Sequence, residues 1–92
     1  MIINLKEILV TQRRISRFDV VEKLVSEIKE GNPITPIYIS EMDEDVFRIE
    51  DGTHRGFAYL ICGKYFLKDG EFQIVPFNFS RQTVGKLTDI SI

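Results

Sequence analysis

The clearest hydrophobic pattern in the chain is an apolar stripe with helical spacing. Its members are Val20, Val21, Leu24, Val25 and Ile28. Lys and Glu residues fill the positions between them, as is typical of an amphipathic helix. Asp19 precedes the stripe as an N-cap, and Gly31 follows it as a C-terminal glycine. The pattern therefore predicts a helix over residues 20–30 whose apolar face covers a sheet.

Two strand-like segments flank an acidic stretch. Residues 36–40 are rich in β-branched and aromatic side chains, and residues 46–50 alternate between apolar and polar. The four carboxylates of residues 41–45 are typical of a solvated turn, with a metal site as the alternative. These segments predict a β-hairpin.

A second helix is predicted over residues 53–62, closed by Gly63. Gly56 lies inside it, although glycine is less favourable than alanine in a helix by about 1 kcal/mol. The apolar face of this helix consists of Phe57, Ala58, Ile61 and Cys62.

The remaining segments are less regular. Residues 72–77 predict a strand that Pro76 places at a sheet edge or brings to its end. In residues 2–10 the spacing of apolar positions mixes the helical and the strand period, and it predicts a short first strand. The polar stretch after Ser80 predicts neither a helix nor a strand. The resulting order, βαββαβ, predicts an α+β fold with two helices and a small mixed sheet.

The composition fits one globular domain spanning residues 1–92. A chain of 92 residues and 10.7 kDa is too short for separate cores. With 43% hydrophobic and 28% charged residues it is not a disordered sequence. The net charge of −2 and the pI near 5.3 argue against a wholly basic nucleic-acid-binding protein, but they leave room for a local basic patch.

Cysteine usage and hydropathy point to an intracellular setting. Cys62 is the only cysteine, so no internal disulfide can form, and no Cys/His cluster indicates structural zinc. We expect Cys62 to fill the core rather than act as a nucleophile. Neither a signal peptide nor an apolar run of about 20 residues is evident. We therefore expect a cytoplasmic protein with no membrane partner.

Candidate chemistry is concentrated where the second hairpin strand meets the second helix. Gly52 allows a tight turn, and the helix start offers free N–H groups and partial positive charge to an anion. Thr53 adds a hydroxyl, His54 an imidazole and Arg55 a guanidinium suited to phosphate oxygens. In the alternative interpretation, Thr53 caps the helix and Arg55 pairs with Glu50 or another surface acid.

Three arginines, Arg13, Arg14 and Arg17, lie within five positions before the first helix. Such a cluster could clamp a nucleotide or contact nucleic acid. It could equally form a solvated loop that balances the acidic hairpin. The sequence leaves both interpretations open.

Taken in order, these segments resemble the ParB/sulfiredoxin superfamily over about residues 3–79. The resemblance lies in the basic stretch, the capped helix, Asn-Pro-Ile-Thr-Pro-Ile-Tyr-Ile, the acidic hairpin and Ile-Glu-Asp-Gly-Thr-His-Arg-Gly-Phe-Ala. Residues 52–55 match the Gly-x-His-Arg form of the family motif. Sulfiredoxins carry a catalytic cysteine where this chain has Thr53. Free serine kinases share Asp-Gly-x-His-Arg but have a glutamate near Gln12, and ParB domains have a Gln-Pro-Arg-like stretch similar to residues 12–14.

The resemblance implies a nucleotide- or phosphate-binding domain. Residues Gly52, Thr53, His54, Arg55, Arg13 and Arg14 would contact the phosphates. As an enzyme it would be an NTPase or a phosphotransferase, with Asp51 and His54 handling a proton and Mg²⁺ accompanying a nucleoside triphosphate or diphosphate. The alternative is a non-enzymatic module that binds DNA or a partner protein in plasmid, phage or chromosome maintenance.

Overall fold

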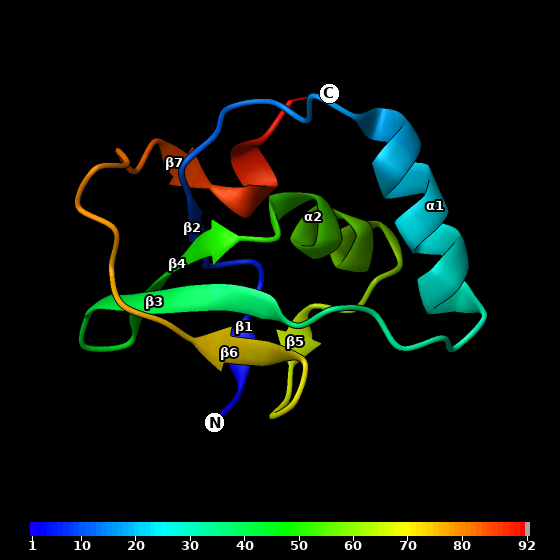
Figure 1. Cartoon of the computed structure of the whole chain (residues 1–92), viewed down its shortest axis with the longest axis horizontal. Helices are drawn as coiled ribbons and strands as arrows, with labels where there is room; N and C mark the ends of the chain where they lie inside the picture. The colour runs from blue at the N-terminus through cyan, green and yellow to red at the C-terminus, as the bar shows by residue number, and fades with distance from the viewer. Residues whose placement is uncertain (92) are drawn as a thin grey trace.

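The computed structural model describes residues 1–91 as a small α+β domain with two helices and a mixed sheet (Figure 1). The predicted fold class is therefore confirmed at this level. The helices are α1 (Phe18–Lys29), α2 (Thr53–Ile61) and a short 3₁₀ helix η1 (Leu87–Asp89). The five-stranded sheet has the order β6 (Phe72–Ile74), β3 (Ile37–Asp43), β4 (Val46–Asp51), β2 (Leu9–Val10) and β7 (Gly85–Lys86). A second, two-stranded sheet joins β1 (Ile3–Asn4) to β5 (Phe66–Leu67).

The predicted hairpin is confirmed as β3–β4, which lies inside the main sheet between β6 and β2. Its register pairs Ile39 with Ile49, and Asp45 takes a φ of 57° at the turn. β3 continues to Asp43, so the acidic stretch is partly strand. The parallel neighbours β6 beside β3 and β2 beside β4 make the sheet mixed. β6 is an edge strand that ends before Pro76, in agreement with the proline signal.

The first helix begins earlier than predicted and packs mainly against α2. Arg17 occupies the N-cap position, so the prediction of Asp19 as N-cap is wrong. Asp19 instead lies in the first turn, where its carboxylate accepts hydrogen bonds from Arg17 Nε (3.1 Å) and Nη2 (2.9 Å). The predicted C-terminal glycine, Gly31, is confirmed by its φ of 77°.

The second helix lies close to the sheet because of its interior glycine. A Cβ at Gly56 would lie 3.0 Å from Ile49 Cδ1 and 3.2 Å from Leu87 Cδ2. Ala58 and Tyr59 are buried on this helix, whereas Ile61 is 48% exposed. The predicted apolar face was therefore partly wrong, since the tight contact at Gly56 turns Tyr59 inward and Ile61 outward.

No helix or strand was predicted for the segment after Ser80, yet this segment completes the core. β7 pairs with β2, and the Leu87 amide donates to the Ile8 carbonyl at 2.9 Å. Leu87 is fully buried and Ile90 is buried as well. Within residues 1–91, neither helix is long and apolar enough to span a bilayer.

Candidate functional site

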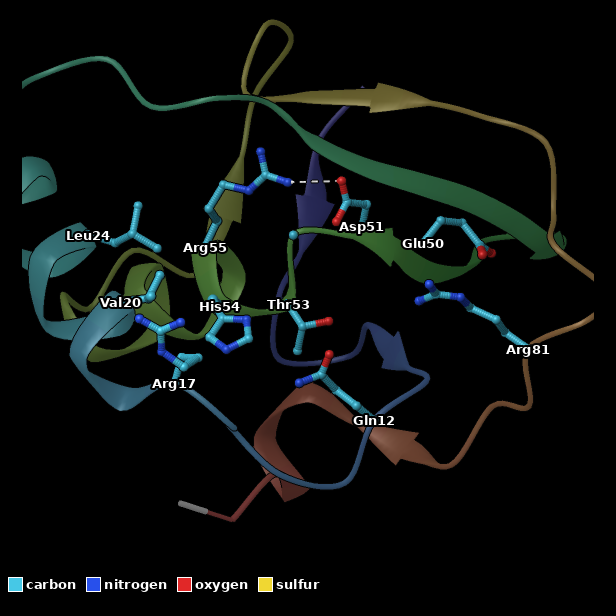
Figure 2. Close-up of a pocket in the computed structure, with 11 residues that line it drawn as sticks. Gln12, Arg17, Val20, Leu24, Glu50, Asp51, Thr53, His54, Arg55 and Arg81 are labelled. Carbon is cyan, nitrogen blue, oxygen red and sulfur yellow. Dashed lines mark ion pairs between the residues drawn. The ribbon is translucent and has the colours of Figure 1, made fainter.

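A cavity of about 530 Å³ lies where β4 runs into α2 (Figure 2). The start of α1, the start of α2 and the segment after β6 contribute to it, so three distant parts of the sequence meet there. Its side chains are mainly polar or charged. They are Gln12, Arg17, Glu50, Asp51, Thr53, His54, Arg55 and Arg81, together with the apolar Val20 and Leu24.

The start of α2 presents its free backbone amides to this cavity. Gly52 is the N-cap with a φ of 109°, and no side chain caps the helix. The Gly56 amide makes the first helical bond, to the Gly52 carbonyl at 2.9 Å. The amides of Thr53, His54 and Arg55 therefore have no acceptor within the helix. The alternative in which Thr53 caps α2 is wrong, because Thr53 is already the first helical residue.

Arg55 connects the helix start to the loop that precedes β3. Its Nη1 donates to the carbonyl oxygens of Pro36 (3.1 Å) and Thr35 (3.3 Å), and its Nη2 lies 3.6 Å from Asp51 Oδ2. The Arg55 side chain is 15% exposed, whereas that of Asp51 is 72% exposed. Pairing with a surface acid, one of the two interpretations of Arg55, is thus confirmed. Because these contacts occupy much of the guanidinium, Arg55 is first a structural residue at the cavity wall.

Two further arginines line the cavity and are freer than Arg55. Arg17 pairs with Asp19, and this hydrogen bond raises the pKa of Arg17 and lowers the pKa of Asp19. Both groups are largely solvent-exposed, so the pair is easily exchanged for another partner. The Arg81 guanidinium makes no hydrogen bond or ion pair with the part of the chain that the structure describes. The sequence pattern grouped Arg17 with a basic stretch and did not reveal Arg81, which lies 26 positions beyond Arg55 in a stretch without pattern.

His54 lines the same cavity and carries an unsatisfied polar atom. Its Nε2 is buried and has no hydrogen-bond partner among residues 1–91. A buried polar atom without a partner costs about 1–3 kcal/mol.

Arg13 and Arg14 do not join the cavity. Both side chains are exposed, and their backbone is held by Ser91, whose amide donates to the Arg13 carbonyl at 3.2 Å. Arg13 instead lines a separate, smaller cavity with the C-terminal segment. Their neighbour Gln12 does reach the main cavity. Thus Gly52, Thr53, His54, Arg55 and Asp51 are brought together, whereas Arg13 and Arg14 are not.

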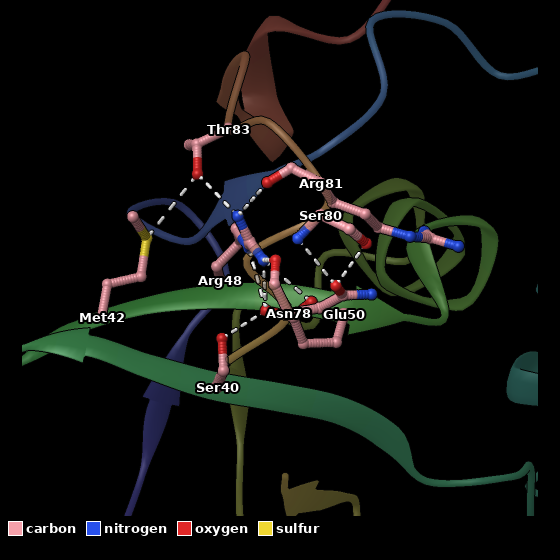
Figure 3. A network of polar contacts seen from close by, with 8 residues as sticks. All are labelled: Ser40, Met42, Arg48, Glu50, Asn78, Ser80, Arg81 and Thr83. Carbon is pink, nitrogen blue, oxygen red and sulfur yellow. Dashed lines mark hydrogen bonds and ion pairs between the residues drawn. The ribbon is translucent and has the colours of Figure 1, made fainter. Parts of the chain in front are cut away.

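A buried ion pair that the sequence did not reveal adjoins the cavity, which one of its members, Glu50, helps to line (Figure 3). Arg48 is fully buried and forms a two-pronged contact with Glu50, Nε to Oε2 at 2.9 Å and Nη2 to Oε1 at 3.0 Å. Glu50 also accepts a hydrogen bond from Ser40 Oγ at 2.5 Å. The only signal was the spacing of Arg48 and Glu50 on one face of a predicted strand, which by itself indicates a solvated face. Of the two acids at the cavity, Asp51 is therefore the one available to a ligand.

In the described chain, no group of three or more His, Cys, Asp or Glu residues could hold a metal by itself. Mg²⁺ in phosphate sites commonly needs only one or two carboxylates, because the phosphates supply further oxygens. Asp51 is exposed at the cavity and meets this requirement. Cys62 is a free thiol that does not line the cavity; its Sγ lies 3.9 Å from the Val25 carbonyl.

No protein-family model matches this chain, and no curated protein or solved structure is significantly similar to it. The resemblance to the ParB/sulfiredoxin superfamily accordingly rests on the sequence motifs alone.

Proposed function

We propose that this chain binds the phosphates of a nucleotide in the cavity at the start of α2. The observation that carries the proposal is the convergence of an uncapped helix N-terminus with Arg17, Arg55 and Arg81 around one cavity. The resemblance of residues 52–55 to the Gly-x-His-Arg motif supports the same ligand class. A cavity of about 530 Å³ lies in the range typical of small-molecule sites.

The arginines contribute more to such binding than the helix does. A helix N-terminus stabilises an anion by about 0.3–1 kcal/mol, whereas a charge-assisted hydrogen bond contributes about 1.5–3 kcal/mol. Arg81 has no competing partner among residues 1–91, and Arg17 has only an exposed one. These two side chains therefore supply most of the affinity, while Arg55 shapes the turn.

Catalysis is the part of the proposal that depends on Asp51 and His54. Asp51 would hold Mg²⁺ on the phosphates or orient an attacking group, and His54 would hydrogen-bond to a phosphate oxygen or move a proton. The chemistry would be nucleotide hydrolysis or phosphoryl transfer. An Asp51→Asn variant that binds nucleotide but releases no phosphate would support this role.

Calorimetric titration with ATP, ADP, CTP and GTP, with and without Mg²⁺, tests binding directly. Arg81→Ala should weaken triphosphate binding about tenfold or more, since it removes a charge-assisted contact. Arg14→Ala removes the same charge from an exposed position outside the cavity and should have little effect. No binding at millimolar nucleotide would refute the proposal. Binding that depends on Arg14 and not on Arg81 would place the site elsewhere.

The exposed Arg13 and Arg14 favour one alternative, a non-enzymatic DNA-binding module. Their side chains lie on a segment whose backbone is fixed by Ser91, away from the cavity. DNA binding through them should weaken steeply with salt and should be reduced in Arg13→Ala and Arg14→Ala. A DNA affinity that does not change with salt concentration would count against this alternative.

A further inference from the structure

A further cavity, of about 370 Å³, lies where α1 and α2 end, and we call it the helix-end cavity. Its lining includes Gly31 and Asn32, which follow α1, and Lys64, which follows α2. It shares no lining residue with the cavity at the start of α2. Its volume lies within the range typical of small-molecule sites, so its lining residues decide which ligand fits.

Both helices bring negative partial charge to the helix-end cavity. The Gly31 amide donates to the Ile28 carbonyl at 3.1 Å, and the Lys64 amide donates to the Tyr59 carbonyl at 2.9 Å, so each helix closes at the cavity wall. The carbonyls that end a helix carry roughly half an elementary negative charge. The cavity at the start of α2 has the opposite polarity, because a helix N-terminus lies there.

Carboxylates add to this negative charge. Glu71 lines the helix-end cavity, and its Oε2 lies 3.1 Å from Nζ of Lys64, the one basic side chain among the described lining residues. Asn32 also lines the cavity, and its side-chain amide donates to Glu27 Oε2 (2.8 Å) and Glu30 Oε2 (3.1 Å). Lys64 offsets one of these three carboxylates. The helix ends and the other two leave an excess of negative charge at the cavity.

The lining also combines a free hydroxyl with an apolar wall. Tyr59 is 6% exposed, and its hydroxyl makes no hydrogen bond with residues 1–91. Burial raises the pKa of Tyr59 and the Glu71 carboxylate raises it further, so the hydroxyl is neutral and lies in the field of that carboxylate. Ile28, Pro33 and Ile34 supply the apolar wall. The lining therefore fits a positively charged hydrogen-bond donor that carries a short alkyl chain.

We infer that the helix-end cavity binds a primary aliphatic amine as its ammonium ion. The ammonium group donates to the Glu71 carboxylate and to Tyr59 Oη, and the alkyl chain packs on Ile28 and Ile34. An ammonium ion has three donors and no acceptor, which matches a lining rich in carboxylate and carbonyl oxygens. Lys64 is 35% exposed, so its contact with Glu71 is readily exchanged for one with the ligand.

Titration with n-butylammonium at constant ionic strength, followed by ¹H–¹⁵N NMR, tests the charge of the ligand. The amide signals of Gly31, Asn32 and Gly70, which line the cavity, should shift saturably. The n-butyrate ion has a similar alkyl chain and the opposite charge, and it should shift none of them. Equal shifts with n-butyrate, or no saturable shift with n-butylammonium, would overturn the inference.

Two substitutions should change the affinity for n-butylammonium in opposite directions. Glu71→Gln removes the negative charge and keeps an acceptor for the Lys68 amide, so binding should weaken about tenfold or more. Lys64→Met removes the competing cation, so binding should tighten. Glu41→Gln is the matched control, because it removes an exposed carboxylate of β3 outside the cavity. An unchanged affinity in Glu71→Gln, or an affinity that does not increase in Lys64→Met, would contradict the inference.

Two further ligands distinguish the source of the amine. Putrescine and a blocked tripeptide with lysine at its centre carry the same butylammonium group. Tighter binding of putrescine identifies a free amine, and tighter binding of the tripeptide identifies a lysine side chain. Because the two cavities share no lining residue, this inference does not rest on nucleotide binding, and either proposal can fail while the other stands.

Discussion

Gly52 meets two requirements at the centre of the candidate site. Its φ of 109° is unfavourable for other residues, and a Cβ there would lie 2.8 Å from Arg55 Nη2. The Arg55 guanidinium folds across the glycine to reach Thr35, Pro36 and Asp51. One missing side chain therefore permits both the turn and the placement of Arg55.

Replacing Gly52 should show both effects. Gly52→Ala should lower the free energy of unfolding by about 2–3 kcal/mol, part from backbone strain and part from displacement of Arg55. Gly63→Ala is a matched control, because Gly63 has a φ of 76° but no atom within 4 Å of the place that a Cβ would occupy. It should cost only about 1–2 kcal/mol. Chemical denaturation of both variants measures the difference, and equal losses would contradict the contact with Arg55.

Arg48 and Glu50 should be strongly coupled. Arg48→Met should destabilise the fold by about 3–5 kcal/mol, since it leaves the buried Glu50 carboxylate without its partner. Arg48→Met combined with Glu50→Gln should recover part of that loss. Arg17→Met breaks an exposed ion pair and should cost much less stability than Arg48→Met. A double variant no more stable than Arg48→Met alone would argue against the coupling.

At the scale of single residues, the sequence could identify residues 51–55 because the turn, the helix start and the motif follow one another directly in the chain. It could not identify Arg48 as buried, because a polar residue on an alternating strand normally faces solvent. The residues that bury Arg48 and accept its hydrogen bonds include Arg81 and Thr83, which lie more than 30 positions away in the sequence. Arg81 was missed because it lies in a stretch without a periodic pattern, between β6 and β7.

Among the elements, α2 is the one that determines the site. Its N-terminus faces the cavity, and its other side packs against Ile49 and Leu87 through the gap left by Gly56. The interior glycine, unfavourable by helix propensity, is explained by this close approach. The predicted helix had the correct position, but its buried face depended on neighbours that the local pattern does not encode.

Because of Tyr59 on α2, the stability of the fold should decrease at alkaline pH. Burial raises the pKa of Tyr59, and the nearby Glu71 raises it further. The unfolded chain then releases the Tyr59 proton at a lower pH than the folded chain, so stability is full below about pH 10 and falls as the pH rises through the folded pKa. Thermal melts of wild type should decline more steeply above about pH 10 than those of Tyr59→Phe, with the exposed Tyr38→Phe as control. Parallel declines in wild type and Tyr59→Phe would contradict this.

At the scale of the whole molecule, the C-terminal segment closes the core around the site. Its β7 strand extends the sheet beside β2, and Leu87 fills the space against Gly56. The sequence predicted the hairpin and both helices, since each has its own periodic or turn signal. The segment after Ser80 has none, and its structure arises from contacts with β2 and Ile8.

Leu87→Ala should therefore behave as a core truncation. We expect a loss of about 2–5 kcal/mol in unfolding free energy, because a fully buried leucine is replaced by a cavity. Thr88→Ala, at the neighbouring exposed position, should have little effect. Urea denaturation provides the measurement. A loss below about 1 kcal/mol would mean that the segment contributes little to the core.

The central claim, a phosphate site at the start of α2, is tested most directly by ¹H–¹⁵N NMR during titration with inorganic triphosphate. The amides of Thr53, His54 and Arg55 lack helical acceptors and should shift most, followed by the amide and side-chain signals of Arg81. Signals of Arg13 and Arg14, outside the cavity, should move little. Saturable shifts centred on residues 52–55 are the predicted result. Shifts centred on residues 13–14, or none at millimolar triphosphate, would contradict the claim.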